Sequence, residues 1–137
     1  MAKVKLPYKY LEKNFFGPLY RPYAKILIKK KSLPKIWLER VLVVDSGADF
    51  TLLPKKDAFL LGIDLAKEAI IDQTFGIGGA EKVYFYKNLE VRLGKNRLKI
   101  PVGFLDRNDI PALLGRQQFL DLFKTTFHNF SVVFEKI

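Results

Sequence analysis

Residues 23–28 alternate apolar and polar side chains with a period near two, the pattern of a β-strand that is buried on one face. A run of four apolar residues, Val41 to Val44, predicts in addition a strand buried on both faces. Glycine, asparagine and proline punctuate these segments and mark the turns. Strands are expected at residues 23–28, 41–44, 50–53, 83–93, 98–105, 125–127 and 132–135.

Two segments have the features of short helices instead. Residues 55–61 follow Pro54, which suits the first turn of a helix, and precede Gly62, which suits its end. Residues 116–123 carry paired apolar positions at helical spacing, which predicts a short amphipathic helix. The sequence therefore predicts one all-β domain with two short helices and mostly antiparallel strands.

The composition narrows the possible chemistry. The 137 residues include no cysteine, which excludes disulfides, thiolate nucleophiles and cysteine metal sites. The one histidine, His128, cannot hold a metal alone, so no metal site or cofactor is expected. Carboxylates remain as the side chains available for catalysis.

The net charge of +10 is concentrated at the N-terminus. Residues 1–40 hold 11 Lys and Arg against 2 Asp and Glu, a net charge of +9. Such a cluster can contact phosphates, and the Tyr and Phe side chains among these lysines could stack on bases. We favour solvated strand faces, because residues 23–28 alternate as a half-buried strand does. Nucleic acid is therefore an unlikely partner.

The apolar runs of the sequence are short. A membrane-spanning helix needs roughly 20 consecutive apolar residues, far more than any run in this chain. Residues 1–20 also lack the apolar centre of a signal peptide. From the sequence we expect a cytoplasmic protein without membrane contact.

The strand at 41–44 ends at Asp45-Ser46-Gly47-Ala48-Asp49. Asp-Ser-Gly is common in turns, but a buried strand that leads into it would carry the Asp45 carboxylate into the interior, where an ionised group is costly without a partner or a function. Residues 76–79, Gly-Ile-Gly-Gly, predict the tip of a hairpin. This hairpin cannot be a phosphate loop, because a strand follows it where such a loop needs a helix.

Taken together, these segments resemble the retropepsin-like aspartic proteases. The features that coincide in order are the Asp45 motif, the strand 50–53, the glycine-rich hairpin, the sequence Leu113-Leu114-Gly115, and Arg116. The resemblance covers about residues 20–135, and residues 1–19 are expected to form a basic extension. The long termini are more similar to cellular and microbial members than to viral ones. A closed barrel of antiparallel sheets, active as a homodimer, is the fold implied.

The resemblance also implies a mechanism and site residues. The reaction needs two carboxylates around a water, and no second Asp here is followed by Ser or Thr and then Gly, so two Asp45 side chains would meet in a homodimer. Ser46 and Gly47 would hold the two motif loops together, and Asp49 would pair with Arg116. The flap and substrate contacts would come from Ala48, Asp49, Gly76, Ile77, Gly78 and Gly79, with Val102, Leu113 and Leu114 as weaker candidates.

The predicted function is therefore peptide-bond hydrolysis by an aspartic endopeptidase that acts on a peptide or protein. The main alternative is a dimeric binding module with the same fold and no activity, because fold alone does not guarantee catalysis. A basic nucleic-acid-binding domain is the third interpretation.

Overall fold

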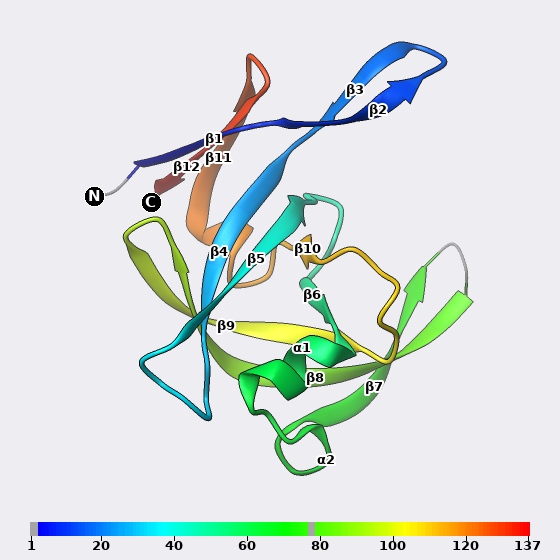
Figure 1. Cartoon of the computed structure of the whole chain (residues 1–137), viewed down its shortest axis with the longest axis vertical. Helices are drawn as coiled ribbons and strands as arrows, with labels where there is room; N and C mark the ends of the chain where they lie inside the picture. Colours follow the sequence, from blue (N-terminus) through cyan, green and yellow to red (C-terminus); the bar gives the residue numbers. More distant parts are fainter. Residues whose placement is uncertain (1–2, 77–78) are drawn as a thin grey trace.

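The structure is a computed structural model that describes residues 3–76 and 79–137 (Figure 1). Most of these residues lie in strands, and the two α-helices are short, which confirms the predicted fold class. The strands are β1 (Lys3–Pro7), β2 (Lys9–Asn14), β3 (Gly17–Arg21), β4 (Tyr23–Lys29), β5 (Trp37–Val44), β6 (Thr51–Pro54), β7 (Ile70–Gly76), β8 (Gly79–Leu93), β9 (Asn96–Leu105), β10 (Leu113–Leu114), β11 (Phe123–His128) and β12 (Ser131–Lys136). The helices are α1 (Lys55–Leu61), α2 (Leu65–Glu68) and the 3-10 helix η1 (Leu120–Leu122).

A seven-stranded sheet in the order β4-β5-β10-β6-β9-β8-β7 forms the body of the molecule. Strands β4 and β8 also pair, with Leu27 opposite Arg92, so the sheet closes on itself as a barrel does. Most neighbours are antiparallel, but β10 runs parallel to β5 and β6 runs parallel to β9. Through its two pairings, β10 brings the end of β5 next to β6 at the middle of the sheet.

The burial pattern of β4 confirms the predicted alternation of buried and exposed side chains. Its alternate residues Ala24, Ile26 and Ile28 are buried in the core. The expectation for β5 is wrong, because only its alternate residues Leu42 and Val44 are buried, whereas Val41 is exposed. A run of β-branched residues favours a strand but does not show that both faces are covered. Within one chain, the outer face of β5 therefore remains open.

Helix α1 begins and ends where the sequence predicts. The backbone N–H of Gly62 donates to the carbonyls of Ala58 and Phe59, and Gly62 has a left-handed φ of 77°. A Cβ at this position would lie 2.6 Å from Ser32 Cβ, so only glycine fits. Helix α2 is a single turn capped by the carboxylate of Asp64.

The helix predicted at residues 116–123 is wrong. The segment forms turns followed by η1. Gln118 has a φ of 53°, a value that an α-helix cannot accommodate. The backbone N–H groups of Arg116 and Gln117 donate to the carbonyls of Ala48 and Asp49. Contacts with the loop after β5 thus shape this segment, and the apolar spacing instead places Phe119 and Leu120 in the core.

The chain ends form a separate three-stranded sheet in the order β1-β12-β11, which includes the predicted terminal hairpin. Strand β1 pairs along its whole length with β12, from Lys3 opposite Glu135 to Pro7 opposite Ser131. Strands β2 and β3 form a two-stranded hairpin that projects from the body beside this sheet (Figure 1).

A buried ion pair joins α1 to the seven-stranded sheet. The Asp57 side chain is 1% exposed, and its carboxylate accepts hydrogen bonds from Arg40 Nε at 3.3 Å and from Arg40 Nη2 at 3.1 Å. A carboxylate in such a place is costly without its cation.

We expect Arg40→Met to lower the free energy of unfolding by about 3 kcal/mol, because it leaves the Asp57 carboxylate buried without a cation. Lys25→Met is the matched control, since Lys25 pairs with Glu39 on the surface. Removal of such a surface pair costs about 0–1 kcal/mol. Urea denaturation of the two variants measures both values. Equal losses of unfolding free energy in the two variants would contradict a stabilising role for the buried pair of Arg40 and Asp57.

Candidate active site

Asp45 directly follows β5, and three backbone hydrogen bonds hold this end of the strand. Its N–H donates to the carbonyl of Leu114 at 3.0 Å, and the N–H of Val43 donates to Ala112 at 2.9 Å. On the other side of the strand, the N–H of Val44 donates to the carbonyl of Pro22 at 3.0 Å. The Asp45 backbone is therefore fixed between β10 and the segment that joins β3 to β4.

The loop after Asp45 is a tight turn in which the N–H of Ala48 donates to the carbonyl of Asp45 at 3.1 Å. The N–H of Gly47 donates to Asp45 Oδ1 at 2.9 Å and so orients the carboxylate. A Cβ at Gly47 would lie 3.3 Å from this oxygen, which is tighter than an ordinary contact. Ser46 is exposed and Asp45 is partly exposed, so the expectation that the strand buries the Asp45 carboxylate is wrong for one chain.

The loops before β6 and after β10 cross at van der Waals distance. A Cβ at Gly115 would lie 2.3 Å from the backbone carbonyl atoms of Phe50, so any other residue would force the loops apart. The N–H of Gly115 donates to Thr51 Oγ1 at 3.1 Å, and Thr51 is fully buried. Thr51 is a site residue that the sequence analysis missed, although a hydroxyl in an otherwise apolar strand could have indicated it.

The structure brings Asp49 and Arg116 together. Arg116 Nη2 lies 2.6 Å from Asp49 Oδ1, and the backbone of Arg116 also donates to Ala48. The side chains of Arg116 and Asp49 are 47% and 75% exposed. The ion pair therefore contributes about 0–1 kcal/mol rather than the roughly 3–5 kcal/mol that breaking a buried pair would cost. Both residues border a shallow pocket of about 440 Å³, which is lined by Asp49, Phe50, Arg116, Gln117 and Asp121.

Strands β7 and β8 form the predicted glycine-rich hairpin. They pair from Ile70 opposite Phe85 to Gly76 opposite Gly79. Gly79 has a φ of 106°, a conformation that favours glycine. Ile77 and Gly78 lie outside the described residues, so their predicted roles in the flap stay predictions.

Of the weaker substrate-contact candidates, Val102 is 1% exposed and Leu114 is fully buried, which makes both of them core residues. Leu113 and Ala48 are partly exposed near the Asp45 loop and remain candidates.

A cluster of ion pairs surrounds residues 106–109, between β9 and β10. Arg107 Nη1 donates to Glu81 of β8 at 2.8 Å, and Arg107 Nε donates to Asp109 at 2.8 Å. Lys55 Nζ, at the start of α1, lies 2.9 Å from Asp106 Oδ1. The loop is thus tied both to α1 and to the glycine-rich hairpin.

These contacts shift the pKa values of the two aspartates. The hydrogen bond from Lys55 holds the pKa of Asp106 below its ordinary value, and the hydrogen bond from Arg107 does the same for the pKa of Asp109. Conversely, the hydrogen bonds to Asp109 and Glu81 raise the pKa of Arg107.

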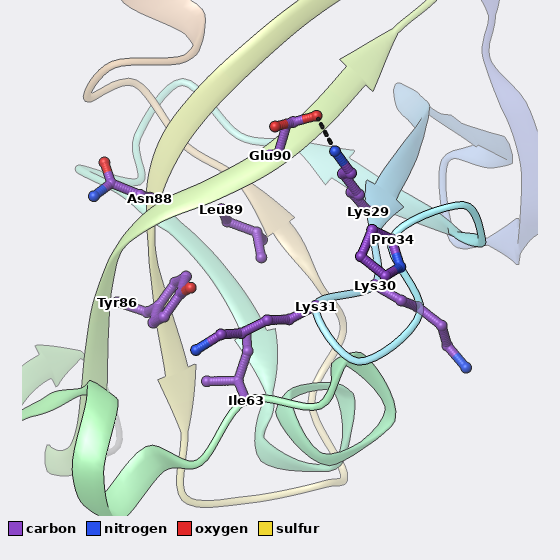
Figure 2. A pocket seen from close by; sticks show the side chains of 9 residues that line it. All are labelled: Lys29, Lys30, Lys31, Pro34, Ile63, Tyr86, Asn88, Leu89 and Glu90. Carbon is purple, nitrogen blue, oxygen red and sulfur yellow. Dashed lines mark ion pairs between the residues drawn. The ribbon is translucent and has the colours of Figure 1, made fainter.

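A second hollow, of about 230 Å³, lies away from Asp45 beside β4 and β8 (Figure 2). Three consecutive lysines border it, but Lys29 lies 3.3 Å from Glu90 and Lys31 pairs with Glu68. Two of its cations are therefore already neutralised, which makes it a poor anion site. Its lining residues are Lys29, Lys30, Lys31, Pro34, Ile63, Tyr86, Asn88, Leu89 and Glu90.

Among residues 3–76 and 79–137, no three His, Asp or Glu side chains gather as metal ligands. In the same described part of the chain, no helix is long and apolar enough to cross a membrane.

Comparisons with known proteins agree with this geometry. A family profile described as "Aspartyl protease" matches residues 38–117, which is more than half of the chain and contains Asp45, Thr51 and Arg116. Among solved structures, a retropepsin-like aspartic protease from Rickettsia conorii superposes with a TM-score of 0.67 at 20% sequence identity, covering 97% of this chain and 98% of that chain. The fold is therefore retropepsin-like, as predicted. No curated protein matches the chain.

Gly115→Ala should lower the free energy of unfolding by about 2 kcal/mol, because overpacking against a rigid neighbour carries a cost of this order. The neighbour here is the backbone of Phe50, which the added methyl group would overlap. Gly47→Ala is the control, since its methyl group meets only the Asp45 carboxylate. Thermal and urea unfolding measure the stability of both variants. The free energy of unfolding should fall clearly less in Gly47→Ala than in Gly115→Ala. A Gly115→Ala variant as stable as the control would contradict the tight crossing.

The carboxyl groups of Asp106 and Asp109 should titrate below the ordinary pKa of 3.8. Because folding lowers these pKa values, both ion pairs stabilise the loop at every pH above the ordinary pKa of an aspartate. This stabilisation is lost as the pH falls through the lowered pKa values of the folded state. Carboxyl carbon NMR during an acid titration measures both groups. Lys55→Met should raise the pKa of Asp106 toward its ordinary value and leave the pKa of Asp109 unchanged. Equal shifts in both pKa values would contradict the separate pairings.

Proposed function

Because this chain belongs to the aspartyl protease family, we propose that it is an endopeptidase whose active form is a homodimer with the two Asp45 side chains at its two-fold axis. The observation that carries the proposal is the position of Asp45. Its backbone is fixed directly after β5, its carboxylate is oriented by the N–H of Gly47, and it remains partly exposed in one chain. Such a group is positioned to meet a partner at this surface.

One chain supplies one suitable carboxylate. Asp49, the nearest acidic residue in the sequence, is engaged by Arg116. No other Asp in the sequence is followed by Ser or Thr and then Gly. Peptide hydrolysis between two carboxylates therefore requires a second copy of the chain.

Electrostatics determines how the two carboxylates would share their protons. Two carboxylates side by side repel each other strongly when both are ionised, so a shared proton stabilises the proposed pair. The pair therefore holds one proton over a wide pH range. The ionised Asp45 takes a proton from the attacking water, while the protonated Asp45 of the other copy donates a hydrogen bond to the scissile carbonyl.

The surrounding residues have supporting roles in this proposal. The glycine-rich hairpin acts as the flap, with Gly76 and Gly79 at the ends of its paired strands and Ile77 and Gly78 between them. Ser46 donates its hydroxyl to the backbone of the partner loop, and Gly47 lets the two loops approach closely. Asp49, Ala48 and Leu113 contact the peptide at the rim of the groove.

Asp45→Asn should abolish cleavage of an unbiased peptide mixture, because the amide can neither accept the proton from water nor form the dyad. Mass spectrometry from about pH 3 to pH 8 measures the rate and the cleavage sites. Wild type should cleave with an optimum on the acid side, where the dyad holds one proton. Asp64→Asn, which keeps the cap of α2, is the matched control and should cleave as wild type does.

Retained cleavage by Asp45→Asn would refute the mechanism. A folded wild-type dimer that cleaves at no pH would instead support the alternative of a binding module on the same fold.

A further inference from the structure

The tip of the β2–β3 hairpin carries two phenylalanines in water. Phe15 and Phe16 are 95% and 91% exposed, and their rings contact each other edge to face with centroids 5.5 Å apart. The hairpin pairs from Lys9 opposite Arg21 to Asn14 opposite Gly17 and projects from the body (Figure 1). Adjacent exposed apolar side chains of this size mark an interaction surface.

This hairpin is shaped before any partner binds. The N–H of Phe16 donates to Asn14 Oδ1 at 2.8 Å. Gly17 has a φ of 111°, so the turn is defined by its own residues. The ring of Tyr20 packs edge to face on the ring of Tyr10, with centroids 5.6 Å apart. It also packs on the ring of Phe130, in the turn between β11 and β12, with centroids 5.3 Å apart. A preformed element loses little conformational freedom when it binds, which favours affinity.

The base of the hairpin adjoins β5, the strand that leads into Asp45. Strand β3 ends at Arg21, and the carbonyl of the next residue, Pro22, accepts the hydrogen bond from Val44, the neighbour of Asp45. At about 3.3 Å per residue, the segment from Pro22 back to Phe16 spans about 20 Å. In the view of Figure 1, the hairpin tip and the paired ends of β7 and β8 both lie on the right, whereas the chain ends lie on the left. Because the base of the hairpin lies beside Asp45 and the tip is about 20 Å away along the strand, a second copy that met Asp45 would lie within reach of the tip.

The terminal strands are already paired within one chain. Strand β12 has β1 on one side and β11 on the other, so its backbone groups have intramolecular partners. By contrast, the aromatic tip of the hairpin packs on itself and leaves most of its surface in water. Side-chain burial at this tip can therefore join two copies without a change in the terminal sheet.

We infer that the β2–β3 hairpin is a dimer clamp: Phe15 and Phe16 of each copy pack on the other copy and hold the two Asp45 loops together. This inference rests on the proposed function, since the dyad requires the second copy. A lipid surface is the rival partner, because Lys9, Lys13 and Arg21 accompany the phenylalanines. The second copy is favoured, because the hairpin begins beside Asp45 and the site is incomplete in one chain.

The double variant Phe15→Ser/Phe16→Ser tests the clamp. Both side chains are exposed in one chain, so their replacement should leave the fold intact, as circular dichroism can check. Phe59→Ser is the matched control, since Phe59 is 85% exposed on α1. Analytical ultracentrifugation over a range of concentrations measures the dimer dissociation constant, which should rise at least tenfold in the double variant and stay unchanged in the control.

The same measurement in an Asp45→Asn background separates the clamp from catalysis, because it needs no cleavage. In the active background, the double variant should lose activity at low enzyme concentration and regain it at high concentration by mass action. A double variant that dimerises and cleaves as wild type does would overturn the clamp and leave the proposed function standing. A wild type that dimerises but never cleaves would overturn the function alone, whereas a monomeric wild type would overturn both.

A photoreactive phenylalanine analogue at position 15 gives a second, direct test. The chain that carries the analogue is mixed with a second copy that carries a heavy isotope label. We expect the analogue to cross-link the two copies, and mass spectrometry locates the product on the labelled copy. Loss of binding to anionic phosphatidylserine vesicles in the double variant, together with an unchanged dimer constant, would overturn the clamp in favour of a lipid surface.

Discussion

The crossing of Gly115 over the backbone of Phe50 is the constraint on which the site depends. It leaves no room for a side chain, so the loop before β6 and the loop after β10 are held in contact. The N–H of Gly115 donates a hydrogen bond to the buried Thr51 hydroxyl. This bond stabilises the crossing, because a buried polar group without a partner would be costly. From β10, the carbonyl of Leu114 then fixes the backbone of Asp45. A rigid crossing thus positions a carboxylate that one chain leaves partly exposed.

Much of this fold could be predicted from the sequence, because the signals are local. The alternation in β4, the strands β8 and β9, and the Pro54 and Gly62 boundaries of α1 all follow from residue pattern and backbone preference. The Asp45 motif and its spacing from Arg116 indicated which loops belong together, and the side chains of Asp49 and Arg116 do meet.

The errors share a physical cause, which is that tertiary contacts are invisible to a local pattern. Residues 116–123 have helical spacing, but hydrogen bonds to Ala48 and Asp49 and the positive φ of Gln118 impose turns instead. The burial of Val41 and Asp45 was overestimated because, among the residues that the structure describes, none covers them fully. Thr51 was missed because its importance depends on a glycine that lies far along the chain, at position 115.

The distribution of ion pairs separates the scaffold from the parts that we propose to contact a substrate. The pair between Arg40 and Asp57 is buried and joins α1 to the sheet, so breaking it would affect the fold itself. The pairs formed by Arg107 and Arg116 are exposed at the rim, where water screens them and each contributes little to stability. Exposed pairs can open and re-form at small cost, which suits a loop and a hairpin that, in the proposed function, border a peptide groove. Because the pKa values of Asp106 and Asp109 are lowered by their hydrogen bonds to Lys55 and Arg107, these two pairs persist in mild acid.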